Sequence, residues 1–133
     1  PYHRKFNFTF DFTPKSAAEA SEVDEIIFEF KKWSAPSMAG AGKNYMYIPD
    51  LWRISYHEAT GKVYRRMNLF KPSMITNLVV QDNPSSNFHI TVQDELNGHV
   101  PVHTAINVFL QETIAPVRED HDRAKVRGHH RGF

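Results

Sequence analysis

Residues 5–13 read Lys-Phe-Asn-Phe-Thr-Phe-Asp-Phe-Thr, and this stretch decides the fold class. Every second residue from position 6 is a phenylalanine and the residues between are polar, which is the period of a β-strand with one buried face. Burial of one such ring contributes about 2 kcal/mol before the entropic cost of ordering. We therefore expect a core strand that places four rings in the hydrophobic core: Phe6, Phe8, Phe10 and Phe12.

The segment after this strand predicts one amphipathic helix over about residues 17–32. Ser16 followed by Glu19 is a capping-box pattern, in which the two side chains bond free backbone N–H groups at the start of a helix. Apolar residues then recur at helical spacing, and Ser34-Ala35-Pro36 ends the helix. The helix residues expected in the core are Val23, Ile26, Ile27 and Phe30.

The rest of the chain to residue 116 reads as short strands between turn residues. Strands are predicted over 45–48, 51–56, 63–67, 74–81, 88–92 and 102–111. Residues 34–44 are small and predict a loop, and Asn97-Gly98 predicts a hairpin turn. Trp52 and Ile54 complete the expected core. The predicted class is mainly β with one α-helix (α+β), an antiparallel β-sandwich or partly closed barrel flanked by that single helix.

Length and composition limit the organisation and the partners. A chain of 133 residues fits one domain, which we place over 1–116, with a mobile charged tail over 117–133. With 16 Lys and Arg against 15 Asp and Glu, the chain is not a generally basic nucleic-acid binder. No apolar run approaches the roughly 18–20 residues that cross a bilayer, so we expect a soluble protein without membrane insertion. The first residue, Pro1, is compatible with processing upstream.

The search for chemistry yields few candidates. The sequence has no cysteine, which excludes disulfides and thiol catalysis. His99 and His103 are separated by Pro101, and on a strand four residues span about 13 Å, so they cannot share a metal. Gly40-Ala41-Gly42-Lys43 lacks the spacing of a phosphate-binding loop. We predict no enzyme, no cofactor and no metal site, with His103 and Glu112 as the candidates of an enzyme hypothesis.

The end of the chain, from residue 123 on, is purely cationic. It carries Arg123, Lys125, Arg127 and Arg131, beside His129 and His130. Such an arm can dock on an acidic neighbour or on a nucleic-acid backbone. A solvated terminus explains the same residues equally well, and both interpretations stay open.

The order of these features resembles the tail-tube domain of contractile-tailed bacteriophages, and most of all the baseplate tube-initiator and tube-cap proteins. The resemblance spans residues 6 to about 113. It rests on Phe-Thr-Pro-Lys-Ser (12–16), Ala-Ala-Glu-Ala (17–20), Ile-Ile-x-x-Phe-Lys (26–31), Ala35-Pro36, Tyr-x-Tyr-x-Pro (45–49), Trp-x-Ile-x-Tyr (52–56), Leu-Val-Val (78–80, after Pro72) and Pro-Val-x-x-x-Ile-x-Val-x-Leu-x-Glu (101–112). The tube, the initiator and the cap share this domain, so all three stay open.

The resemblance implies a structural subunit of a phage tail. Six copies would form a ring around a channel that DNA passes without specific contact, and the ring would template tube polymerisation. The implied partners are other tail-tube and baseplate proteins, the sheath and the tape measure, in a virion assembled in the host cytoplasm. The residues expected at subunit and ring contacts are Met38, Gly40, Gly42, Lys43, His57, Lys62, His103, Asn107 and Phe109. The alternative hypothesis is a monomeric β-sandwich that binds a ligand through Tyr45, Tyr47 and Trp52.

Overall fold

The computed structural model describes residues 3–39, 42, 45–82, 91–94, 98–101 and 103–133. The chain divides into two compact units. Unit 1 consists of Pro1–Phe6, Leu51–Thr76 and Leu110–Phe133, and unit 2 of Asn7–Asp50 and Asn77–Phe109. Residues 110–133 belong to the same unit as two segments far from them in sequence.

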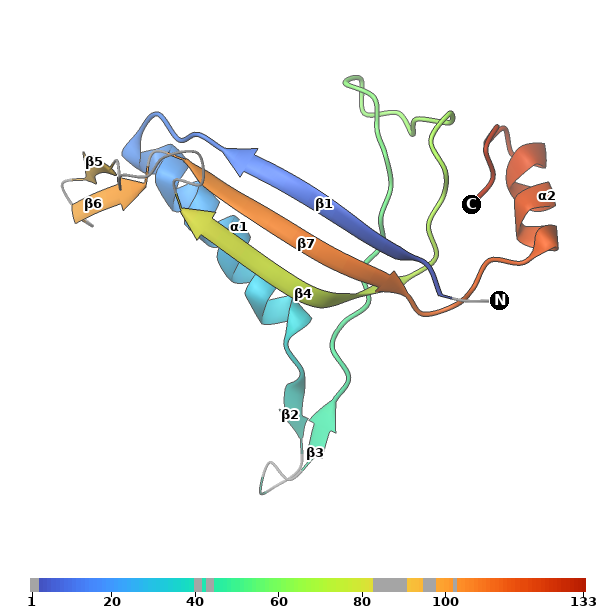
Figure 1. Ribbon diagram of the computed structural model, residues 1–133, viewed down its shortest axis with the longest axis horizontal. Coiled ribbons are helices and arrows are strands. Elements are labelled where there is room, and N and C mark those ends of the chain that lie inside the picture. The colour runs from blue at the N-terminus through green and yellow to red at the C-terminus, as the bar shows by residue number, and fades with distance from the viewer. Residues whose placement is uncertain (1–2, 40–41, 43–44, 83–90, 95–97, 102) are drawn as a thin grey trace. The chain divides into compact units, whose positions relative to one another are not determined.

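The described part of the chain is mainly β with two helices (Figure 1). The elements are β1 (Lys5–Phe12), α1 (Ala17–Ser34), β2 (Ser37–Ala39), β3 (Tyr45–Tyr47), β4 (Ser73–Asp82), β5 (Thr91–Asp94), β6 (Gly98–Pro101), β7 (Thr104–Glu112) and α2 (Arg118–Val126). One sheet has the order β1-β7-β4, and β2-β3 and β5-β6 are antiparallel hairpins. The expected α+β class is confirmed at this level.

One detail of the predicted architecture is wrong, and the predicted sandwich or partly closed barrel is not confirmed. The single helix is joined by a second, α2, within the segment predicted as a mobile tail. Among the described residues, the strands form no closed barrel. A helix as short as α2 is not stable alone, so it depends on contacts that its own sequence does not reveal; Ala124, on its inner side, is 2% exposed.

β1 and α1 follow their sequence patterns. The phenylalanines of β1 are more buried than the polar residues between them, except Phe10. The Ser16 hydroxyl accepts a hydrogen bond from the Glu19 backbone N–H at 3.2 Å, as the capping pattern predicts. The Phe10 and Phe30 rings lie 6.3 Å apart, so α1 packs on the phenylalanine face of the sheet (Figure 1).

The centre of the core is β7 and not β1. Ile106, Val108 and Leu110 are 0%, 2% and 5% exposed, because β7 is the middle strand and is covered by a neighbour on both sides. Two residues predicted in the core are exposed instead: Phe10 at 43% and Ile26 at 38%. Phe10 lies on β1, an outer strand of the sheet. Ile26 lies on a side of α1 that is exposed to solvent.

Two predicted strands are absent from unit 1. Trp52, Ile54 and Tyr56 are half-buried and their neighbours are exposed, as the alternation predicts. Yet over 51–72 the structure has only isolated bridges, between Trp52 and Ser73 and between His57 and Val63. The strands predicted over 51–56 and 63–67 are therefore wrong, since a period of two predicts an extended backbone but not a partner to pair with it.

Two further predictions concern hairpins. Residues 37–39, predicted as loop, form β2 and pair with β3. The hairpin predicted at Asn97-Gly98 is confirmed by the pairing of β5 with β6, in which Asp94 lies opposite Gly98. Gly40 and Lys43, expected at ring contacts, lie outside the described residues, as do most residues of the strand predicted over 88–92.

Candidate assembly surfaces and a basic hollow

The hairpin of β2 and β3 exposes nearly all of its apolar side chains. Met38 lies opposite Met46 in the ladder and Ala39 opposite Tyr45. The large apolar residues and their exposed fractions are Met38 51%, Tyr45 72%, Met46 68%, Tyr47 65% and Ile48 84%. Apolar side chains gathered this way on a soluble chain mark an interaction site. Figure 1 shows the hairpin extending beyond the end of α1.

The outer strands of the three-stranded sheet leave backbone groups open. β1 and β4 each pair with β7 on one side only, among the described residues. At its first residue, β4 also bonds Trp52, whose N–H and carbonyl lie 2.7 and 2.9 Å from the Ser73 carbonyl and N–H. Beyond that bridge, no described strand covers the outer side of β4. Open edges of this kind are templates for pairing with another chain.

Glu112, a candidate of the enzyme hypothesis, is held in a structural ion pair. Its side chain is fully buried and accepts hydrogen bonds from Arg4 Nε at 2.8 Å and Arg4 Nη2 at 2.7 Å. The backbone N–H of Lys71 donates a third bond at 3.0 Å. These contacts join the start of β1, the end of β7 and the loop before β4, and they engage both carboxylate oxygens.

The second candidate, His103, pairs with Asp11 across neighbouring strands. The distance from His103 Nε2 to Asp11 Oδ1 is 3.0 Å. Asn107, further along β7, accepts a hydrogen bond from the Thr9 hydroxyl at 2.6 Å. Both residues were expected at subunit contacts, and the structure uses both to join β7 to β1. Phe109, expected beside them, is half-buried on the same strand.

His57 and Lys62 lie in one tight turn of unit 1. The His57 ring bonds the Ser55 hydroxyl at 2.8 Å and the Gly61 carbonyl at 3.1 Å. The Glu58 N–H donates to the Lys62 carbonyl at 2.7 Å, which closes the turn. Gly61 has φ +87°, a left-handed conformation that glycine adopts without steric cost. The two predicted contact residues are thus neighbours in space.

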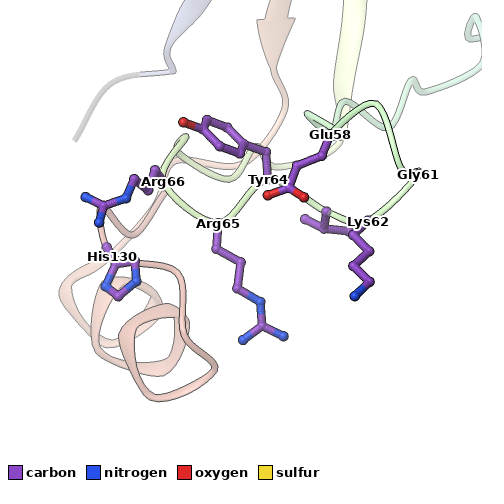
Figure 2. Close-up of a pocket in the computed structure, with 8 residues that line it drawn as sticks. Glu58, Gly61, Lys62, Tyr64, Arg65, Arg66 and His130 are labelled. Atoms are coloured by element: carbon purple, nitrogen blue, oxygen red, sulfur yellow. The ribbon is translucent and has the colours of Figure 1, made fainter.

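This turn forms one wall of a basic hollow of about 680 Å³ (Figure 2). We define the basic hollow by its lining residues, which are Glu58, Gly61, Lys62, Val63, Tyr64, Arg65, Arg66 and His130. The His130 N–H donates to the Arg65 carbonyl at 3.2 Å and so fixes the C-terminal segment against the loop. Three of the lining side chains are cations, and no described ion pair involves any of them.

The two units carry opposite charges. Unit 1 holds 12 Lys and Arg against 5 Asp and Glu, a net charge of +7. Unit 2 holds 4 against 10, a net charge of −6. The overall charge of +1 conceals this separation, because unit 1 is assembled from three distant segments. The sequence carries one indication of this charge separation, because residues 51–76 contain five cations and one anion.

The described part of the chain has neither a cluster of metal-binding residues nor a membrane-spanning helix. No group of three or more His, Asp or Glu residues there could hold a metal ion. No described helix is both long and apolar enough to cross a membrane. Comparison of the sequence with known protein families and with curated proteins finds no match.

Proposed function

We propose that this chain is a structural subunit of a contractile phage tail. Copies of it form a hexameric ring of the tail tube or of the baseplate tube initiator, which templates tube polymerisation and encloses the DNA channel. The order of sequence motifs supports this assembly together with one structural observation: among the described strands, β1 and β4 each have an outer edge that pairs with no other strand, on either side of the buried strand β7.

The open edges support assembly because a sheet of three strands does not protect its own backbone. β7 is satisfied on both sides, whereas β1 and most of β4 have one side without a described strand. A closed ring of identical copies removes such edges by pairing each outer strand with a neighbour. In that ring the three-stranded sheets become one continuous wall, and the expected tail-tube-like sandwich is completed between copies.

The exposed hairpin of β2 and β3 supports a second contact in the same assembly. Tyrosine and methionine are enriched at protein interfaces, and the hairpin presents Tyr45, Tyr47, Met38 and Met46 together. We assign this hairpin to contacts with a neighbouring copy or with the next ring. The further partners, which are baseplate, sheath and tape-measure proteins, and the location in the virion follow from the resemblance.

The test is the oligomeric state of the purified chain, measured by mass photometry and by negative-stain electron microscopy. We expect six-membered rings, alone at high concentration or after addition of tail-tube protein. A chain that stays monomeric under both conditions would overturn the proposal.

A matched pair of variants localises the contact. Met46→Glu places a charge on the exposed hairpin and should abolish rings, while circular dichroism stays unchanged. Val126→Glu, at a residue 88% exposed on α2, makes a similar change elsewhere and should assemble normally. Rings from Met46→Glu would exclude the hairpin from the contact.

A monomeric ligand-binding module is the second candidate, favoured by the exposure of Tyr45 and Tyr47. It predicts a monomer at every concentration and a change in tryptophan fluorescence on addition of ligand. The mass measurement separates the two candidates, because only the ring subunit associates.

A further inference from the structure

We infer that the basic hollow is the docking site for a second copy of this chain, which presents the acidic surface of its unit 2. Copies then join head to tail, with unit 1 of one copy against unit 2 of the next. The inference rests on the proposed function in that it requires self-association, and it adds which surfaces meet and what holds them together.

First, the cationic side chains of the basic hollow point to an acidic partner, because of their exposure and their lack of ion pairs within the described part of the chain. Lys62, Arg65 and Arg66 are all exposed, and no carboxylate pairs with them among the described residues. Arg65 Nη1 donates a hydrogen bond to the Arg127 carbonyl at 3.4 Å. Figure 2 shows Lys62 and Arg65 extending from the loop to the same side. These cations are available to an acidic partner.

The second argument is that the chain itself supplies such a partner surface. Unit 2 carries a net charge of −6, and complementary fields steer and orient association. A shallow hollow of about 490 Å³ on α1 is lined by Ser21, Glu22, Asp24, Glu25 and Phe28. Glu22 and Glu25 are three residues apart on the helix, where like charges repel. Arginine side chains from a neighbouring copy would remove that repulsion.

The third argument concerns the lining of the basic hollow, which fits a protein better than nucleic acid. Glu58 lies within it and would repel a phosphate backbone. Val63 and Tyr64 also line it and are 42% and 39% exposed. A phosphate backbone makes no favourable contact with the Val63 side chain, whereas Phe28, 59% exposed between carboxylates on α1, can bury its ring against Val63 and Tyr64.

The consequence is an assembly with direction. A contact between two different surfaces of the same chain is heterologous, so it produces a ring where the rotation closes and an open filament where it does not. Each copy in a closed ring has its basic hollow filled by one neighbour and its acidic surface covered by the other. The charge separation within one chain is then neutralised between chains.

Two double charge reversals test the contact. Arg65→Glu with Arg66→Glu makes the basic hollow acidic, and Glu22→Lys with Glu25→Lys makes the α1 surface basic. All four side chains are exposed, so both variants should fold, as circular dichroism checks. Each variant alone should associate at least roughly tenfold more weakly than wild type, because like charges would meet at every contact. An equimolar mixture should assemble again, with the two variants alternating around the ring.

Salt dependence and a matched control sharpen the result. Wild-type assembly should weaken between about 0.05 M and about 0.5 M NaCl, since exposed charge pairs are screened. Arg118→Glu with Lys125→Glu makes the same charge change on α2, at two exposed residues that do not line the basic hollow, and should assemble like wild type. Loss of assembly in this control would overturn the assignment to the basic hollow.

The remaining outcomes separate this inference from the proposed function. Hexamers that resist salt and form from both reversal variants overturn the inference and leave the ring proposal standing. Salt-sensitive open chains that never close into hexamers overturn the ring proposal and leave the inference standing. If the Arg65→Glu, Arg66→Glu variant assembles normally but loses binding of short duplex DNA that wild type shows, the occupant is nucleic acid and the inference is wrong. A wild-type chain that never associates overturns both.

Discussion

The guanidinium of Arg4 donates two hydrogen bonds to the carboxylate of Glu112, at 2.8 and 2.7 Å. In the other direction, the Glu112 backbone N–H donates to the Arg4 carbonyl at 2.9 Å. The two residues are 108 positions apart in the sequence. The carboxylate is fully buried, and the pair connects the start of β1 to the end of β7.

Glu112→Gln should destabilise the fold strongly. The substitution removes the negative charge, so the guanidinium of Arg4 loses its ion-pair partner and keeps the Leu69 carbonyl as an acceptor. Breaking a buried ion pair by removing one member costs about 3–5 kcal/mol, and we expect the lower end because the Arg4 side chain is 24% exposed. Urea unfolding followed by circular dichroism measures the change. Glu119→Gln, an exposed carboxylate on α2, is the control and should change stability by less than about 0.5 kcal/mol; equal effects of the two would contradict the structural role of Glu112.

The stability of unit 1 should fall in acid because of Asp120. The Val117 backbone N–H, which donates at 3.0 Å, and the Lys71 ammonium, at 3.0 Å, hold the pKa of Asp120 below its ordinary value of 3.8. A lowered folded-state pKa contributes stability that is complete above the unfolded pKa and is lost as the pH falls through the folded one.

Asp120→Asn tests this dependence. Wild type should be more stable than the variant at pH 7, and the difference should shrink as the pH falls below 3.8. Thermal unfolding between pH 7 and pH 3 measures both proteins. A difference that stays constant across this range would show that the charge of Asp120 contributes nothing.

Gly61→Ala should strain the turn that shapes the basic hollow. An added Cβ meets no atom within 4 Å, so the cost comes from the backbone alone, at φ +87°. For a residue with a Cβ the left-handed conformation costs about 1–2 kcal/mol. Gly61→Asn is the matched control, because asparagine visits this conformation more readily, and it should cost less. Equal unfolding free energies for both variants in urea titrations would refute the conformational explanation.

Phe28→Ala should separate association from stability. Phe28 is 59% exposed, so its truncation should leave the unfolding free energy almost unchanged while it weakens head-to-tail assembly. Ile106→Ala is the contrasting variant: Ile106 is fully buried on β7, and its truncation should cost about 2–5 kcal/mol. Mass photometry and urea unfolding of both proteins give the two readouts. If the Phe28→Ala variant assembles fully, the Phe28 side chain is not part of the docking surface.

Local pattern was enough where an element is defined by its own residues. The alternation of Phe6 to Phe12 predicts β1, and the pattern from Ser16 onward predicts α1 to within two residues of its end at Ser34. The β5-β6 hairpin was likewise predicted from Asn97-Gly98. In each case the spacing of neighbouring side chains restricts the backbone, and no distant contact is needed to infer it.

The errors arose where an element needs a distant partner. The extended segment at 51–56 has the alternation of a strand, but it is joined to other segments only by the Trp52–Ser73 bridge and by the bond from the Tyr64 N–H to the Tyr56 carbonyl, among the described backbone contacts. The short helix α2 is held by the contact of Asp120 with Lys71, which lies 49 positions earlier in the chain. The candidate site shows the same limit, because Lys62 was predicted as a contact residue whereas its neighbour His130 was assigned to the tail.

By itself, therefore, the sequence determined the local backbone of β1, α1 and one hairpin, together with a charge balance near zero. Only the tertiary structure decided that β7 is the centre of the core, that no described strand pairs with the outer edges of β1 and β4, and that the charges separate into a basic unit 1 and an acidic unit 2. The physical reason is the distance along the chain over which each effect acts. Backbone conformation responds to the nearest few residues, whereas burial and electrostatic potential sum over groups that folding brings together from distant parts of the chain.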